Sequence, residues 1–399
     1  MNASRPRAAV DPDATPIPPL FILTFLFSVA TAVMWNGLGF VAKSSYAFPE
    51  WKTSLLFVVN GVIYALGAFG CGRFLRAIAG HSTPRGILLV VLLIQTAAAP
   101  LMGIFSGTWA IWTVSIIFSL CSAVLWSTVE SYMSAGRHGH SMRTVIGWWN
   151  LTWMSSNALG LAAMAFFMAD AQGSRWSVAA LAPICLLATI MVFWLPRSPA
   201  AHDSEKSGIP LRARYRPMLQ TSRIMLPMSY VLIGALGPIM PYRLDQLEIG
   251  LSWVTPLTAT WLVARVGCVL LMSKLHFWHG RWGTLGAAAL LMVGGFALVT
   301  MGPGVASVLA GLALIGIGQG LTYYSAIYYV LALGNAAVDA AGTHEGLIGV
   351  GYAAGPAAVL IGILMGGDST VAWVVMALVV IVAWPAVSPW WTTRGRLSD

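Results

Sequence analysis

A single arginine stands in the middle of a long apolar stretch of this chain. Arg265 lies about twelve residues into the run 253–275, and the next charged side chain in that run is Lys274. In a membrane a lone guanidinium costs several kcal/mol unless it is paired or wetted. An unpaired cation in a hydrated cavity indicates an anionic ligand; the alternative is a structural arginine held by backbone carbonyls or side-chain amides.

Neutral polar and aromatic side chains recur at helical spacing. Asn150, Trp153 and Asn157 lie at i, i+3 and i+7, and this spacing places them on one helix face. Such faces suit a small organic solute, although the same side chains can instead hold neighbouring helices together. The expected substrate-binding residues are Asn36, Asn60, Tyr64, Asn150, Trp153, Asn157, Trp261, Arg265, Gln319, Tyr323 and Tyr352.

Three titratable residues lie inside or at the ends of apolar runs. Glu130, His344 and Glu345 are the candidates for coupling transport to protons, because a proton-driven carrier usually has a titrating group embedded in the membrane. We expect both carboxyl groups near the inner ends of their runs rather than at the depth of Arg265. They are therefore either coupling groups or parts of a gate, and substrate exchange or uniport stays open.

The elements that position these residues must cross a membrane. The 399 residues are 58% hydrophobic and only 9% charged, against roughly a quarter charged in a soluble domain. One helical crossing needs about 20 apolar residues. Marking apolar runs predicts twelve crossings, at 18–40, 53–72, 86–105, 108–133, 143–168, 175–195, 224–242, 253–275, 283–301, 304–333, 343–366 and 370–389.

A polar, basic segment divides these crossings into two sets of six. The expected organisation is an N-terminal tail 1–17, a six-helix bundle 18–195, a linker 196–223, a second six-helix bundle 224–389 and a C-terminal tail 390–399. If the N-terminus lies inside, seventeen Lys and Arg residues fall on the inner side and four on the outer side. Because basic loops stay cytoplasmic, we expect a multi-pass cell-membrane protein with both termini in the cytoplasm.

Polarity falls at every third crossing. The third crossing holds Gln95 as its one amide, tyrosine or ionisable residue, and the sixth, ninth and twelfth hold none apart from Arg175, the first residue of the sixth, which is counted with the outer loops. Polar side chains in hydrocarbon are costly unless they are wetted or paired. The other eight crossings are therefore predicted to surround a hydrated pathway.

This architecture resembles the major facilitator superfamily of secondary transporters. The resemblance implies two pseudo-symmetric six-helix halves around a midplane site, with the third, sixth, ninth and twelfth helices outside. The stretches Gly72–Gly80 and Ser273–Arg281 are similar to the family's loop motif Gly-x-x-x-Asp-Arg-x-Gly-Arg, although Arg76 stands where the acidic residue belongs. The resemblance implies that Arg73 and Arg76 belong to a cytoplasmic gate.

A glycine- and proline-rich stretch lies in the eleventh crossing. Gly349-x-Gly351-x-x-x-Gly355-Pro356 resembles the motif of drug antiporters, but antiporters carry it on the fifth helix. The fifth crossing here has no Gly-Pro, so antiport is not supported. We interpret these glycines as permitting close helix packing or a bend.

Several other classes of function are disfavoured. The basic residues are scattered rather than gathered on one face, which argues against nucleic acid. The four cysteines have no metal or disulfide spacing, and neither an intramembrane protease motif nor a Walker A loop is present, so no metal, cofactor or enzymatic activity is expected. The chain is predicted to be a monomeric, gradient-driven transporter of a small organic solute, with anions as the favoured class and protons as a candidate coupling ion. The alternatives are an exporter of amphipathic compounds, or a non-transporting receptor or membrane enzyme.

Overall fold

The computed structural model describes residues 14–134, 136–137, 139–200, 215–275, 277–332 and 338–394. All the regular elements in these residues are helices. The first half consists of α1 (Ile17–Ala32), η1 (Val33–Gly37), α2 (Leu38–Tyr46), α3 (Glu50–Ala77), α4 (Pro84–Ala98), α5 (Pro100–Ile104), α6 (Thr108–Ser134), α7 (Gly139–Ala163), η2 (Met164–Phe167), α8 (Ala171–Ala179) and α9 (Leu181–Val192). The second half consists of α10 (Tyr215–Gln246), α11 (Leu251–Thr258), α12 (Thr260–Lys274), α13 (Trp282–Met301), α14 (Val305–Ala332), α15 (Val338–Gly366) and α16 (Asp368–Arg394).

Each of the twelve expected crossings coincides with one of these helices or with consecutive helices in line. Ten are long and apolar enough to span a bilayer by length and composition. The other two are α7, which carries the polar stripe of Asn150 and Asn157, and α16, whose apolar part is Thr370–Trp384. Helical structure also extends beyond the expected limits, since α10 begins at Tyr215 rather than at 224 and α2 ends at Tyr46 rather than at 40. Charged side chains end an apolar run but not a helix, because a helix can continue into water.

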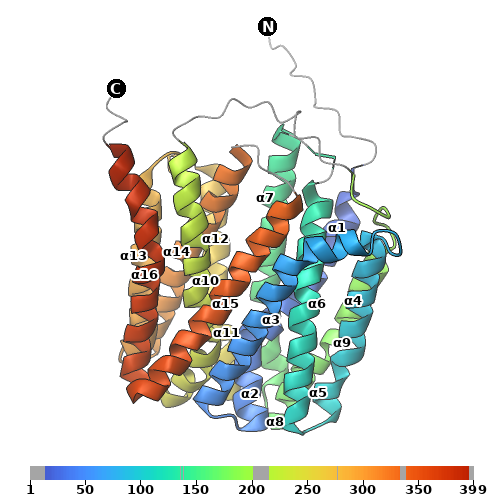
Figure 1. The fold of residues 1–399 in the computed structure, drawn as a ribbon. Coiled ribbons are helices and arrows are strands. Elements are labelled where there is room, and N and C mark those ends of the chain that lie inside the picture. Colours follow the sequence, from blue (N-terminus) through green and yellow to red (C-terminus); the bar gives the residue numbers. More distant parts are fainter. Residues whose placement is uncertain are drawn as a thin grey trace.

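The helices run up and down between two ends of the molecule (Figure 1). One end is where α1 begins, α3 ends and α16 ends, and we call it the basic end because it carries Arg73, Arg76 and Arg85. At the opposite end, α2 is followed by α3 and α10 by α11. The two halves meet along α3 and α15, which lie side by side across the middle of the molecule (Figure 1).

Helix α15 packs closely against both halves. A Cβ atom at Gly349 would lie 2.7 Å from the Cα of Ala65 on α3, and one at Gly355 would lie 2.7 Å from the amide nitrogen of Ala235 on α10. Two backbones can approach this closely only where a side chain is missing. The interpretation of this glycine motif as a packing motif is therefore confirmed.

The helices of the third, sixth, ninth and twelfth crossings face outward. Large apolar side chains on α4, α9, α13 and α16 are exposed, among them Val90 at 56%, Leu187 at 50%, Leu290 at 77% and Trp384 at 73%. Exposed apolar side chains on these helices are suited to contact with lipid, but α3 and α12 carry them as well, such as Leu66 at 68% and Leu271 at 61%. What distinguishes the four helices is their packing, since α4 and α9 contact mainly each other, α6 and α1, and α13 and α16 contact mainly α14, α10 and α15, all within their own halves. The polar content of the sequence thus predicted which helices lie outside.

Candidate functional site

A small cavity, which encloses about 50 Å³, lies between the two halves. Its side chains come from α1, η1, α3, α6 and α7 of the first half and from α10, α14 and α15 of the second. Among the described residues, none of the lining side chains comes from α4, α9, α13 or α16. The lining residues are Thr31, Trp35, Tyr64, Trp126, Trp149, Trp153, Tyr230, Tyr323, Glu345, Ile348 and Tyr352.

Aromatic rings form two rows along the wall of this cavity. In the first row Trp35 stacks on Tyr352 with ring centroids 4.4 Å apart, and Tyr64 and Tyr230 meet this pair edge-on at 5.3 and 5.2 Å. We call these four residues the stacked row. The second row, which we call the tryptophan row, contains Trp126, Trp149, Trp153 and Tyr323, whose successive centroids are 6.1, 6.5 and 5.4 Å apart. The walls are therefore apolar planes with polar groups at the ring edges.

Arg265 on α12 packs against the tryptophan row. Its Cζ atom lies 4.3 Å from the ring centroid of Trp153 and 4.8 Å from that of Tyr323, both within cation–π range. The side chain is 2% exposed, and among the described residues its Nε and Nη2 atoms have no hydrogen-bond partner. A buried N–H without an acceptor costs about 1–3 kcal/mol, so these donors need a water or a ligand as acceptor.

Gln319 on α14 adds a second unsatisfied group beside the arginine. Its side chain is fully buried, and in the described part of the chain neither its Nε2 nor its Oε1 atom has a hydrogen-bond partner. The phenol of Tyr230 faces both Arg265 and Gln319. We call these three groups the polar corner: Tyr230 lines the cavity, whereas the cation and the amide lie behind its aromatic wall.

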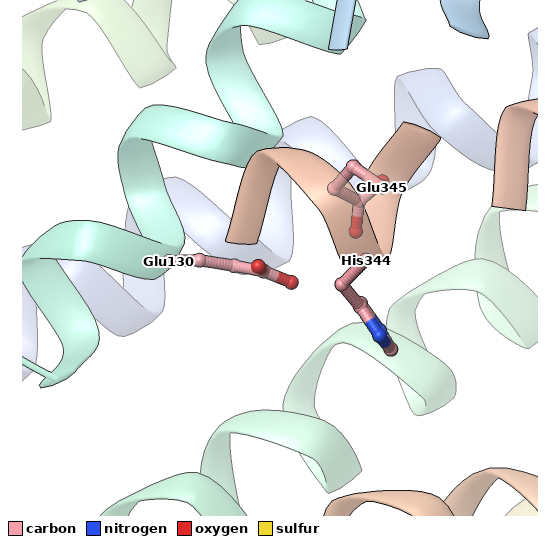
Figure 2. Close-up of side chains that lie close together, drawn as sticks. All are labelled: Glu130, His344 and Glu345. Atoms are coloured by element: carbon pink, nitrogen blue, oxygen red, sulfur yellow. The ribbon is translucent and has the colours of Figure 1, made fainter. Parts of the chain in front are cut away.

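Two carboxyl groups and a histidine meet between the halves. Glu130 on α6 points toward His344 and Glu345 on α15, and their ligand atoms all lie within 4.8 Å of one another (Figure 2). The hydroxyl of Tyr64 on α3 donates a hydrogen bond to Glu345 Oε2. The ligand oxygens of Glu130 and Glu345 lie within 4.8 Å of each other, and a hydrogen bond between these two carboxyl groups would require a proton because two ionised carboxylates have only acceptors.

The two carboxyl groups lie near the ends of their helices, Glu130 in the last turns of α6 and Glu345 in the first turns of α15. Glu345 nevertheless lines the cavity together with Tyr323, the ring that packs on Arg265, and the sequence did not predict this. The ring of His344 lies edge-on to Tyr323 at 6.1 Å.

The remaining expected site residues are distributed unevenly. The amide of Asn150 donates to Ile146 O at 2.8 Å and accepts from Trp153 Nε1 at 2.8 Å, so it orients Trp153 instead of facing the cavity. Asn157 donates to Trp153 O at 2.9 Å. Asn60 and Trp261 are buried outside the lining, and Asn36 lies next to it on η1. Arg73 and Arg76 are exposed on the last turns of α3, away from the cavity.

Sequence reasoning missed several lining residues. Trp35, Trp126, Trp149 and Tyr230 were not among the expected binding residues, yet all four line the cavity. Trp149 and Trp153 are four residues apart, so their shared helix face was readable from the sequence. Trp35 was not readable in this way, because it lies in the π-helical turn η1, which changes the direction of the side chains around it.

The opposite end is closed by polar contacts between the halves. Lys43 on α2 forms an ion pair with Asp245 on α10, with Nζ and Oδ2 2.5 Å apart. The hydroxyl of Tyr242, also on α10, donates to Phe48 O at 2.6 Å and lies 2.7 Å from Thr53 Oγ1. We call these contacts the surface bridge, and we call the Glu130–Glu345–Tyr64 contacts the buried bridge.

Known proteins resemble this chain in family pattern and fold. Residues 20–360 match the family model described as Major Facilitator Superfamily. The crystal structure of the nucleoside transporter NupG is similar, with a TM-score of 0.67 and 12% identity over 93% of this chain and 98% of that chain. The human organic anion transporter MFSD10 (TETRAN) has a TM-score of 0.64 and 14% identity over 93% and 98%. At these identities the two likenesses concern the fold alone, and no curated protein sequence matches significantly.

Proposed function

We propose that this chain, which belongs to the Major Facilitator Superfamily, carries a small organic anion across a cell membrane, driven by a gradient. The two halves would expose the cavity alternately to the two sides, as in other carriers built from two repeats. An anion is favoured because the one arginine in contact with the tryptophan row presents two donors without acceptors. That single observation carries the assignment.

The geometry of the arginine supports an anion over a neutral solute. Nε and Nη2 lie on the same edge of the guanidinium plane, and that edge can donate to both oxygens of one carboxylate. A structural arginine in a membrane protein would use these donors on backbone carbonyls. Here both are unsatisfied while the ring contacts hold the plane in position.

Protons are the coupling ion that the buried bridge supports. Glu130 and Tyr64 belong to the first half and Glu345 to the second, so a proton held between the two carboxyl groups joins the halves. Loss of that proton would place two negative charges side by side in a region of low dielectric. Proton release would therefore be linked to separation of the halves at this point.

The distribution of charge supports an orientation with both termini in the cytoplasm. The basic end carries the loops that are rich in arginine and lysine, and the positive-inside rule assigns such loops to the cytoplasm. The opposite end, with the surface bridge, would then face outward.

Exchange in proteoliposomes tests the anion assignment. A panel of labelled organic anions and neutral solutes is offered for counterflow with the wild type, Arg265→Gln and Arg265→Lys. The Gln variant loses two charge-assisted hydrogen bonds to the substrate, so its anion exchange should fall by about 30-fold or more. The Lys variant should retain part of the activity, because lysine keeps the positive charge but lacks the two parallel N–H donors of the guanidinium. Arg197→Gln is the matched control, since that side chain is exposed on the basic end. A fully active Arg265→Gln variant, or exchange of neutral solutes alone, would overturn the proposal.

An exporter of amphipathic compounds is a second candidate, favoured by the eight aromatic rings among the eleven lining residues. Such compounds are usually cationic or neutral, and they would pair with Glu345 rather than with Arg265. Exchange of lipophilic cations that persists in Arg265→Gln and disappears in Glu345→Gln would support this candidate over the first.

A further inference from the structure

The unsatisfied donors of Arg265 and Gln319 lie behind the aromatic wall of the cavity, because Arg265 packs on the lining residues Trp153 and Tyr323 while neither donor residue lines the cavity itself. Together the donors and the wall define more of the substrate than its charge. We propose, on the basis of the anion transport proposed above, that the substrate is a planar aromatic carboxylate. Its carboxylate would meet Arg265 and Gln319, and its ring would lie between the stacked row and the tryptophan row.

The first step of the argument concerns the carboxylate. Trp153 and Tyr323 pack on Arg265 and leave the Nε and Nη2 edge free of acceptors. Gln319 lies on the adjoining helix, where a Cβ atom at the neighbouring Gly320 would come within 3.2 Å of the Arg265 carbonyl oxygen. A carboxylate can therefore accept from the arginine edge and from the amide Nε2 of Gln319 at the same time.

The second step concerns the body of the substrate. Eight of the eleven lining residues are aromatic, and Ile348 is the one aliphatic side chain among them. Rings prefer other rings, in offset-stacked or edge-to-face geometry, over saturated surfaces of equal area. The ring faces and edges of the two rows therefore favour a flat, unsaturated substrate over a saturated one.

The third step concerns size and polarity. The cavity encloses about 50 Å³ in this conformation, which is room for only a few waters, so the two rows must move apart to admit a ring and a small ligand is favoured. The lining offers few groups that could satisfy a polyhydroxylated solute, namely Thr31, the tyrosine hydroxyls and Glu345. A compound with one ring and a single carboxylate suits these walls best.

Matched pairs of ligands test this inference. Benzoate and cyclohexanecarboxylate share charge and approximate size but differ in the aromatic ring, and benzamide keeps the ring without the charge. Each is measured for thermal stabilisation of the purified full-length chain and for competition in counterflow. We expect benzoate to bind about three- to tenfold more tightly than cyclohexanecarboxylate, as the aromatic pair preference predicts, and benzamide to bind weakly.

Two tryptophan variants on the same helix give the matched control. Trp153→Leu should remove most of the preference for benzoate, and Trp153→Phe should restore part of it because a ring is retained. Trp148→Leu should leave the preference unchanged, since Trp148 is 62% exposed on α7 outside the cavity. Each variant is judged by the ratio of its affinities for benzoate and cyclohexanecarboxylate, so a variant that is purified in lower yield can still be compared with the wild type.

The outcomes separate this inference from the proposed function. Equal or better binding of cyclohexanecarboxylate, or exchange of aliphatic anions without response to benzoate, would overturn the aromatic substrate while leaving anion transport in place. Failure of every anion in both assays would overturn both proposals.

Discussion

The two halves are joined by two polar bridges that differ in their surroundings. The surface bridge depends on the ion pair Lys43–Asp245, whose side chains are 25% and 70% exposed, and on the hydroxyl of Tyr242. The buried bridge links Glu130, Glu345 and Tyr64 at the cavity, where Glu345 is 8% exposed. Water screens the first bridge, so its ion pair is worth about 0–1 kcal/mol. The second has no such screening, so its strength depends on whether a proton is present.

This difference shows where control of the transport cycle is to be expected. A contact whose strength does not depend on a bound proton can close one end of the molecule, but it cannot link the opening of that end to a proton gradient. A contact that needs a bound proton can link the two. The comparison therefore assigns closure to the surface bridge and coupling to the buried bridge, and three substitutions test that division.

The largest effect is expected from Glu345→Gln. The amide cannot gain or lose a proton at neutral pH, so an imposed proton gradient should no longer drive substrate accumulation. Because the affected hydrogen bond is buried and charge-dependent, we expect accumulation to fall by about tenfold or more, while counterflow without a gradient persists. Uptake into proteoliposomes after a pH jump measures the first quantity. The exposed Glu248→Gln serves as the control, and gradient-driven accumulation at the wild-type level in Glu345→Gln would remove the buried bridge from coupling.

An intermediate effect is expected from Tyr242→Phe. The variant loses the hydroxyl that joins Phe48 O and Thr53 Oγ1, and each lost hydrogen bond weakens the fold by about 1 kcal/mol. We expect the melting temperature of the purified protein to fall by about 1–3 °C with proton coupling intact. Tyr46→Phe is a matched control because the Tyr46 hydroxyl has no partner. Loss of coupling in Tyr242→Phe would contradict the division between the bridges.

The smallest effect is expected from Asp245→Asn. An exposed ion pair of this kind contributes at most about 1 kcal/mol, and salt near 1 M shortens the screening length to about 3 Å. The melting temperatures of wild type and variant should therefore differ by about 1 °C or less at low salt and coincide at high salt. A large difference that persists in high salt would mean that this pair is not screened.

The sequence predicted the large-scale arrangement well, because hydropathy and the spacing of polar residues report directly on contact with lipid or cavity. The exposed apolar faces of α4, α9, α13 and α16 agree with the low polarity of their crossings. The hydropathy pattern also identified Arg265, because a charged side chain in the middle of an apolar run interrupts that pattern. The confirmed close packing at Gly349 and Gly355 follows from residue size alone.

The detailed site could not be predicted because it depends on how far helices extend and how they turn. The place of Glu345 in the cavity wall could not be predicted, because the residues that it meets on other helices cannot be read from its own apolar run. Asn150 and Asn157 were expected to face a substrate, but a side-chain amide near its own helix backbone can bond there instead, and both do so. The contribution of Trp35 depends on a π-helical turn that has no simple pattern in the sequence.

That turn also makes the first crossing serve two different neighbours. One additional residue in a helical turn rotates everything after it by about 100° relative to a regular α-helix. Before the turn, α1 packs on α6, α7 and α9 of its own half; after it, α2 packs both on α8 of its own half and on α10 of the other half. One continuous helix is thereby divided into a part that packs within the first six-helix bundle and a part that also contacts the second bundle. Trp35 lies at the junction of the two parts.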